Sequence, residues 1–185
     1  MGTVVMKYVV LCQLLVYNTV IKKLMRCKMY LVNAKTFPKQ IEIPNIVSNK
    51  ITVLTNCTIT EDEVIMFNAS LKAVCEYIQK NNILLEDYFA FNVVFTEDGS
   101  FSFEERQNAT LGNQFQLAVY NMAKLRDLKD NEMMLFVFLE ELCHYFFRIE
   151  DEKNVKYRVE EIFKIFYPTF DLQELRRRYS LNGFN

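Results

Sequence analysis

The sequence contains no tryptophan, and its 185 residues include only four glycines and three prolines. An all-β sandwich needs many turns rich in these two residues, so their scarcity favours a fold with sizeable helices. The chain has a single histidine, His144, and none of its five cysteines forms a C-x-x-C pair. This excludes the common structural zinc sites. We therefore expect buried, reduced thiols and a cytoplasmic protein.

The composition is that of a globular protein, with 51% apolar residues and 24% charged residues. Its length predicts one domain, residues 1–185, with a core of its own. The net charge of −1 is unevenly distributed, because the first sixty residues hold eight Lys or Arg and one acidic residue. This asymmetry predicts either two faces that attract each other, which we favour, or a basic end that meets an acidic partner.

Residues 4–20 form a hydrophobic stretch that Lys7 interrupts and that basic residues follow. We favour a core strand or helix here, and expect no membrane association. The stretch is short of a full span, and no small-residue cleavage site of a signal peptide follows it. Two alternatives stay open for residues 1–28: a membrane anchor or signal, and a true start near Met25 or Met29.

Short β-branched runs punctuated by proline predict strands in the next part of the chain, at residues 29–34, 39–44 and 50–55. A helix is then expected to begin after Thr60. Thr60 and Glu63 have the spacing of a capping box, and apolar residues recur with helical period up to Asn81–Asn82.

A hairpin is expected next, because two strand-like runs, 88–95 and 100–103, flank a turn that contains Gly99. Residues 114–120 alternate like a third strand, but they also fit the beginning of a helix that continues through Leu125, which we favour. These runs together predict a small antiparallel sheet.

A central helix is predicted at about residues 131–150, because from Met133 to Ile149 the chain is apolar on nearly every side. A helix of this kind is a buried one. Asp130 can cap it. A further amphipathic helix at 154–166 follows, and then a short helix after Asp171. The expected fold class is α+β, with the antiparallel sheet packed against several helices.

The central helix carries Glu140, Glu141 and His144 in its apolar middle. Glu140 and His144 are one turn apart and share a face. Burying a charge without a partner costs several kcal/mol, so these side chains need partners. One interpretation is a structural Glu–His–Arg cluster completed by Arg148. The other is a metal site.

The segment Glu140-Glu141-Leu142-Cys143-His144 resembles the H-E-x-x-H motif of zincin metallopeptidases, with Glu in place of the first His. Its apolar lead-in and the acidic pair Asp151 and Glu152 are also similar to small zincin-like domains of phages and mobile elements. The resemblance covers roughly residues 60–166, which we expect to form a zincin-like core.

The resemblance implies a role for each residue of this segment. Glu141 matches the general base, Glu140 and His144 match two metal ligands, and the third ligand would be a downstream acid. The acids available for this role are Asp151, Glu152, Glu160 and Glu161. One histidine with two or three carboxylates suits Mn²⁺ or Fe²⁺ better than zinc. The loss of the first histidine instead indicates a degenerate domain without a metal cofactor, which we favour.

These observations predict a non-catalytic interaction or regulatory protein with a protein partner, of the kind that mobile elements encode to inhibit a host protein. The alternative is a metal-dependent hydrolase, a peptidase that uses zinc or another divalent metal. A second alternative is a nucleic-acid-binding protein that uses the basic first third of the chain together with Arg176, Arg177 and Arg178. Arginines at a helix C-terminus also simply suit the helix dipole. No glycine-rich phosphate loop is present.

Overall fold

The computed structural model describes residues 30–31, 35–36, 41–85, 91–104 and 116–171, together with 173–174 and 177. The expectations for residues 1–28 and for Arg176 and Arg178 lie outside these residues. The chain divides into two compact units, one of Met1–Val32 with Phe101–Gln114 and one of Asn33–Ser100 with Phe115–Asn185. Each unit is described by itself.

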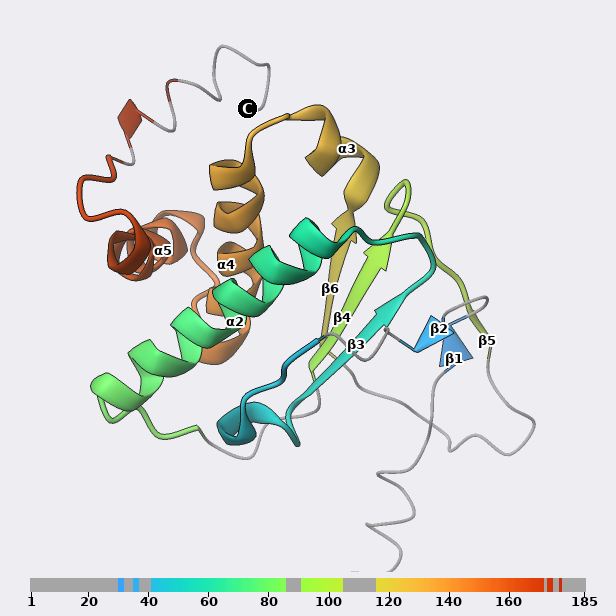
Figure 1. Ribbon diagram of the computed structural model, residues 1–185. Helices are drawn as coiled ribbons and strands as arrows, with labels where there is room; N and C mark the ends of the chain where they lie inside the picture. Colours follow the sequence, from blue (N-terminus) through green and yellow to red (C-terminus); the bar gives the residue numbers. More distant parts are fainter. Residues whose placement is uncertain are drawn as a thin grey trace, which may run out of the picture. The chain divides into compact units, whose positions relative to one another are not determined.

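In the first unit, β1 (Tyr30–Leu31) pairs antiparallel with β5 (Phe103–Glu104). In the second, four strands form a sheet in the order β2-β3-β4-β6 (Figure 1). These strands are β2 (Lys35–Thr36), β3 (Ile51–Thr55), β4 (Phe91–Thr96) and β6 (Gln116–Asn121).

The prediction of a small antiparallel sheet was wrong in its strand direction, although the α+β class is correct. In the four-stranded sheet, β3, β4 and β6 run parallel, and the two-residue β2 runs antiparallel to its neighbour β3. The predicted hairpin does not form either. The turn at Gly99 exists, with a φ of 85°, but the chain after it pairs with β1 and not with β4. Local turn residues signal a reversal, whereas the strand that pairs afterwards is decided by non-local packing.

Helix α2 (Glu61–Lys80) connects the parallel strands β3 and β4. The predicted capping box is confirmed, because the Glu63 backbone N–H donates to Thr60 Oγ1 (3.3 Å) and the Thr60 N–H donates to Glu63 Oε2 (2.8 Å). The predicted end is also confirmed, since Asn81 is the C-cap and Asn82 takes a positive φ of 50°.

The segment after residue 114 contains a strand and a helix in succession. Strand β6 passes directly into α3 (Met122–Asp127), so the helix prediction was wrong up to Asn121 and correct around Leu125. The strand expected at 39–44 is not formed by residues 41–44, which lead into a 3-10 turn, η1 (Asn45–Val47).

The predicted central helix is confirmed as α4 (Asn131–Phe147), and Asp130 caps it by accepting a hydrogen bond from the Met133 N–H (3.1 Å). It is followed by α5 (Glu152–Phe166). Within the described residues, no helix is both long and apolar enough to cross a membrane.

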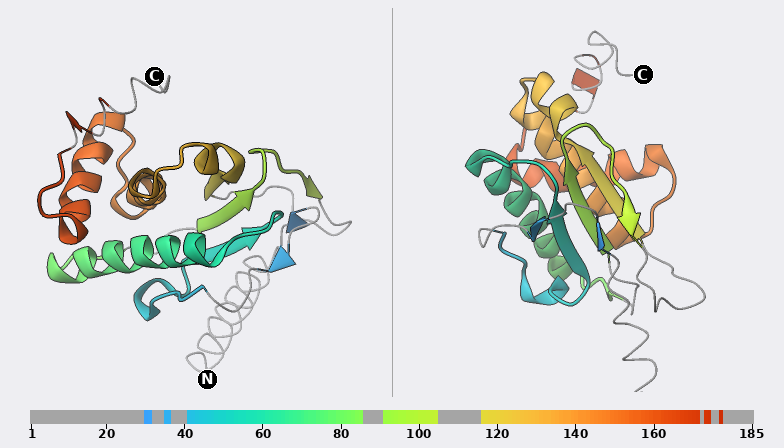
Figure 2. Two further views of the ribbon diagram at one scale, coloured as in Figure 1. Left: turned by 45° about the horizontal axis from the view of Figure 1, so that its top comes forward. Right: turned by 90° about the vertical axis from the view of Figure 1, so that its right-hand side faces the viewer.

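Helices α2 and α4 pack against one face of the sheet (Figure 2). The fully buried ring of Phe67 on α2 meets Phe95 of β4 edge-on at a centroid distance of 5.1 Å. The same ring meets Phe138 of α4 at 5.6 Å and Tyr120 of β6 at 6.3 Å. This aromatic centre fixes α4 against the carboxyl half of the strands.

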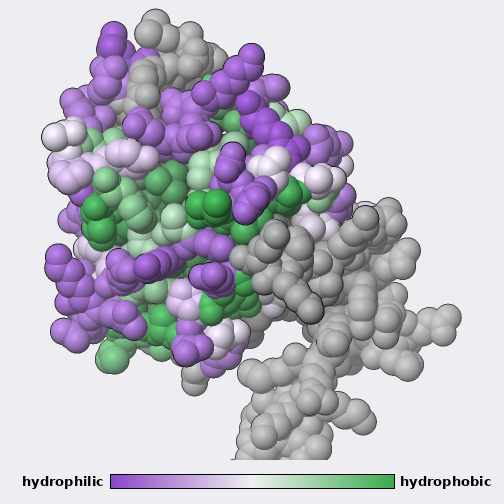
Figure 3. Space-filling model, viewed as in Figure 1, coloured by the Kyte–Doolittle hydropathy of each residue, from purple (hydrophilic) through white to green (hydrophobic). Residues whose placement is uncertain are grey.

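The surface mixes apolar and polar side chains. On the face seen in Figure 3, hydrophobic areas lie between bands of hydrophilic residues. Among the described residues, the large apolar side chains that are exposed are Ile65, Leu84, Tyr157, Ile165, Phe166 and Tyr167. Three of these are consecutive at the end of α5, at positions 165–167.

Candidate functional site

The C-terminal half of α4 carries the polar residues that the sequence analysis identified. Glu140, Glu141 and His144 are half-buried there, on a helix most of whose other side chains are buried in the core. The helix ends at Arg148, which takes a left-handed conformation (φ 51°, ψ 43°) and turns the chain. Helix α5 then begins four residues later, at Glu152, and packs against α4. The first turns of α5 are therefore brought back beside His144.

His144 is held through both ring nitrogens. Its Nδ1 lies 2.5 Å from the carbonyl oxygen of Ile149, and its Nε2 lies 3.6 Å from Glu152 Oε1. A carbonyl oxygen only accepts hydrogen bonds, so Nδ1 carries the proton and donates. In the neutral ring, Nε2 then carries a lone pair, and this lone pair faces the Glu152 carboxylate. A cation close to the pair would offset the charge of this carboxylate.

The cation beside these groups is Lys156 of α5. Its Nζ lies 3.9 Å from Glu140 Oε1 and 3.8 Å from Glu152 Oε2. Glu140 Oε1 is buried and accepts no hydrogen bond from any of the described residues. Burial raises the pKa of Glu140, while the charge of Lys156 opposes this rise. The lysine ammonium thus supplies the positive charge that the buried carboxylate needs.

Glu141, the residue that matches a general base, is also half-buried. Burial raises the pKa of its carboxyl group, His144 lowers it, and Glu152 raises it further. The raised pKa makes Glu141 a better proton acceptor than an exposed glutamate. Glu152 therefore lies near both Glu141 and Lys156.

The acids downstream of α4 are used in other ways. Asp151 is the N-cap of α5, where its Oδ1 accepts a hydrogen bond from the Asn154 N–H (2.8 Å). Glu160 pairs with Lys164 (2.7 Å), and Glu161 pairs with Arg158 (3.0 Å). Of the expected ligands, the fold therefore brings Glu140 and Glu152 to Lys156 and places His144 beside Glu152. Asp151 serves as a helix cap.

These residues do not fit a metal centre as they are placed. Nowhere in the described part of the chain do three or more His, Cys, Asp or Glu residues converge so as to hold a metal ion. The ammonium of Lys156 approaches two of the carboxylates that would be ligands. A divalent cation and an ammonium would repel each other at such distances.

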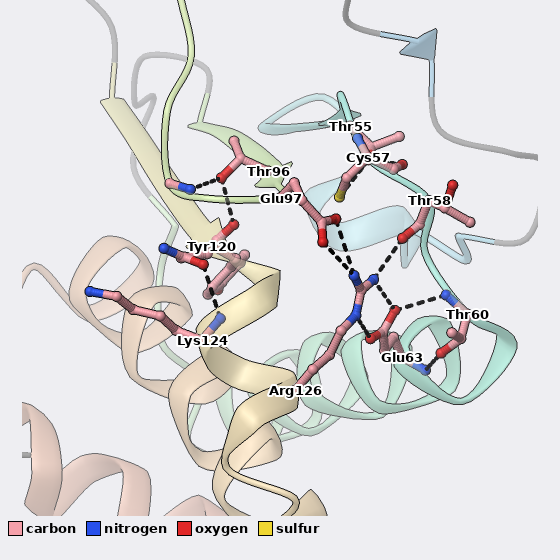
Figure 4. Close-up of polar contacts among 12 residues, drawn as sticks. Thr55, Cys57, Thr58, Thr60, Glu63, Thr96, Glu97, Tyr120, Lys124 and Arg126 are labelled. Atoms are coloured by element: carbon pink, nitrogen blue, oxygen red, sulfur yellow. Dashed lines mark hydrogen bonds and ion pairs between the residues drawn. The ribbon is translucent and has the colours of Figure 1, made fainter. Parts of the chain in front are cut away.

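A second polar cluster lies where the parallel strands end, around Arg126 of α3 (Figure 4). Its Nε donates to Glu63 Oε1 (2.7 Å), and one terminal nitrogen donates to Glu63 Oε2 (3.1 Å) and to the Thr58 carbonyl (2.6 Å). The other terminal nitrogen donates to Glu97 Oε2 (3.2 Å). Burial raises the pKa of Glu63, but the hydrogen bonds from Arg126 and Thr60 outweigh it and keep that pKa below the ordinary value.

Open parallel sheets usually bind ligands at the carboxyl ends of their strands, where this cluster lies. Here, however, all three guanidinium nitrogens of Arg126 are engaged within the chain, so they do not form an anion site. Thr96 closes the neighbouring turn, because its Oγ1 donates to the Tyr120 carbonyl (3.1 Å) and accepts from the Gly99 N–H (2.8 Å). The nearby Cys57 thiol has a pKa raised by burial, which argues against a nucleophile. The cluster is structural.

Sequence reasoning missed Lys156, Arg126 and Glu97. The capping box pointed to Glu63, but no spacing rule connects it with Arg126, which lies 63 positions away. Lys156 had a usable signal, because it is four residues after Glu152 and therefore shares its helix face.

No family model matches this sequence, and no curated protein or solved structure shows significant similarity to it.

Proposed function

We propose that this protein is a non-catalytic interaction or regulatory protein, built on a zincin-like scaffold whose metal-ligand positions its own side chains neutralise. The observation that carries the proposal is the position of Lys156, whose ammonium lies within 4 Å of both Glu140 and Glu152. An internal cation takes the place that a divalent metal would need.

The other contacts support the same interpretation. A zincin-type peptidase needs at least three protein ligands and an open position for water. Here Asp151 is engaged as a helix cap, and Nε2 of His144 faces Glu152 at 3.6 Å. Burial raises the pKa of Glu141, but its role as a general base would require a metal at these positions. The polar residues of α4 then serve to hold α4 and α5 together.

The resemblance to domains of phages and mobile elements favours a protein of the host as the partner. Such a partner would recognise the surface of the scaffold. The polar cluster of α4 and α5 would only maintain the conformation of that surface. Substitutions at His144 are then expected to change stability more than partner binding.

The test is elemental analysis of the purified full chain, prepared without chelators, beside His144→Ala. We expect less than a stoichiometric amount of Zn, Mn or Fe in both proteins. One equivalent of metal in the wild type that disappears in His144→Ala would overturn the proposal.

A metal-dependent hydrolase is the second candidate function, and one observation favours it. Glu140 Oε1 is buried and accepts no hydrogen bond from the residues that the structure describes, and burial raises the pKa of both Glu140 and Glu141. A bound divalent cation would relieve both effects. Hydrolysis of a casein-derived peptide mixture after addition of Mn²⁺ or Zn²⁺, abolished in Glu141→Gln, would establish this function. An unchanged peptide mixture would exclude the hydrolase and leave the interaction protein as the proposed function.

A further inference from the structure

Strand β6 forms one edge of the four-stranded sheet, next to β4 (Figure 1). It spans six residues, Gln116–Asn121, and pairs with β4 along its whole length. Among the described residues, no strand pairs with its other side.

The contacts with β4 show which backbone groups of β6 face outward. The Gln116 carbonyl accepts a hydrogen bond from Asn92 Nδ2 (3.3 Å), and the Tyr120 carbonyl accepts one from Thr96 Oγ1 (3.1 Å). Both donors belong to β4, so the peptide groups of positions 116 and 120 face β4. Backbone direction alternates along a strand. The N–H and C=O groups of Leu117 and Val119 therefore point to the open edge.

Within the part of the chain that the structure describes, this edge lacks the usual protection against pairing with another chain. Natural edge strands are blunted by charged residues, by proline, by bulges or by very short length. The sequence of β6, QLAVYN, contains no charge and no proline, and it pairs with β4 in unbroken register. Its edge can therefore accept a further strand.

We propose that β6 pairs antiparallel with β6 of a second copy of this chain, across a two-fold axis at Ala118. In this register Leu117 lies opposite Val119 of the second copy, and Val119 lies opposite Leu117. These are the positions whose backbone groups face outward, so all four groups on each edge find a partner. The two sheets then form one continuous sheet. The inference goes beyond the proposed function and does not depend on it.

The side chains agree with this register. Leu117 and Val119 lie on the same face of β6 and are partly exposed, so an apolar pair forms on each side of the axis. Ala118, at the axis, is small and 2% exposed, so it places no bulk between the two strands. Strand β6 has no charged side chain, so no like charges face each other across the axis. A contact that uses the same strand twice closes as a dimer.

The first experiment measures the molar mass of the full chain by sedimentation over a range of concentrations. Wild type is expected to reach twice the monomer mass as concentration rises, and Val119→Pro is expected to stay monomeric and folded by circular dichroism. Proline at position 119 removes only an outward N–H, which edge strands tolerate. Ala118→Pro is the matched control, because it removes an N–H that faces β4 and should unfold the chain. A wild type that remains monomeric, or a dimeric Val119→Pro, would overturn the proposal.

A second measurement decides the question without any variant. Amide hydrogen exchange of the wild type is compared in dilute and concentrated solution. The Leu117 and Val119 amides are expected to exchange about tenfold or more slowly in concentrated solution, while the Ala118 and Tyr120 amides stay protected in both. Rates at Leu117 and Val119 that do not depend on concentration would contradict the pairing.

Discussion

The Glu63 carboxylate accepts two hydrogen bonds from the Arg126 guanidinium, at 2.7 and 3.1 Å, across 63 positions of sequence. The Glu63 side chain is only 5% exposed, and it also completes the capping box of α2. This pair joins the beginning of α2 to α3, at the end of the parallel strands where a ligand could otherwise bind.

Replacing Arg126 with methionine should lower the free energy of unfolding by about 2–3 kcal/mol, because a buried carboxylate loses charge-assisted hydrogen bonds. Urea unfolding measures the change. Lys124→Met, an exposed position on the same helix, is the control and should stay within about 0.5 kcal/mol of wild type. The double variant Glu63→Gln/Arg126→Met should lose less free energy of unfolding than the sum of the losses in the two single variants. Equal losses in Arg126→Met and Lys124→Met would show that the pair does not stabilise the fold.

Asp151 offers a test of a helix cap against a metal ligand. Asp151→Ala should lower stability by about 1 kcal/mol, whereas Asp151→Asn should be nearly neutral, because asparagine caps a helix about as well as aspartate. Thermal unfolding with and without added Mn²⁺ measures both variants. A metal-dependent loss of stability in Asp151→Asn would instead identify Asp151 as a ligand.

The pH dependence of stability should report on Glu140. Because burial raises its pKa in the folded protein, the unfolded chain loses this proton first, and stability falls as the pH rises above the ordinary value of 4.5. Glu140→Gln has no proton to lose there. Its stability relative to wild type should therefore increase from about pH 4 to about pH 7. Denaturant unfolding at several pH values measures this, with the exposed Glu150→Gln as control. A difference between Glu140→Gln and wild type that stays constant with pH would contradict the burial of this charge.

The parts of the fold that depend on local signals were predictable. The capping box of Thr60 and Glu63 places the beginning of α2 because both residues lie within one turn. The all-round apolar segment from Met133 to Ile149 predicts a buried helix because every side of it must be covered, and α4 fulfils this.

The parts that depend on distant segments were not predictable. Nothing in the sequence of β4 states that β3 and β6 will be its neighbours, because parallel pairing joins strands across long connections. Glu140 and His144 were expected to share a helix face from their spacing, and the resemblance to zincins implied Glu152 as one of four downstream acids that could join them. Lys156 was not recognised, since its role depends on how α5 folds back on α4.

The central claim is that the Lys156 ammonium takes the place of a metal ion, and calorimetric titration with Zn²⁺ and Mn²⁺ tests it most directly. We expect no stoichiometric binding to wild type. Lys156→Met should bind one equivalent, and His144→Ala/Lys156→Met should lose most of that affinity, by about tenfold or more. One equivalent bound by the wild type and lost in His144→Ala would contradict the claim, as would Lys156→Met that binds no more metal than wild type.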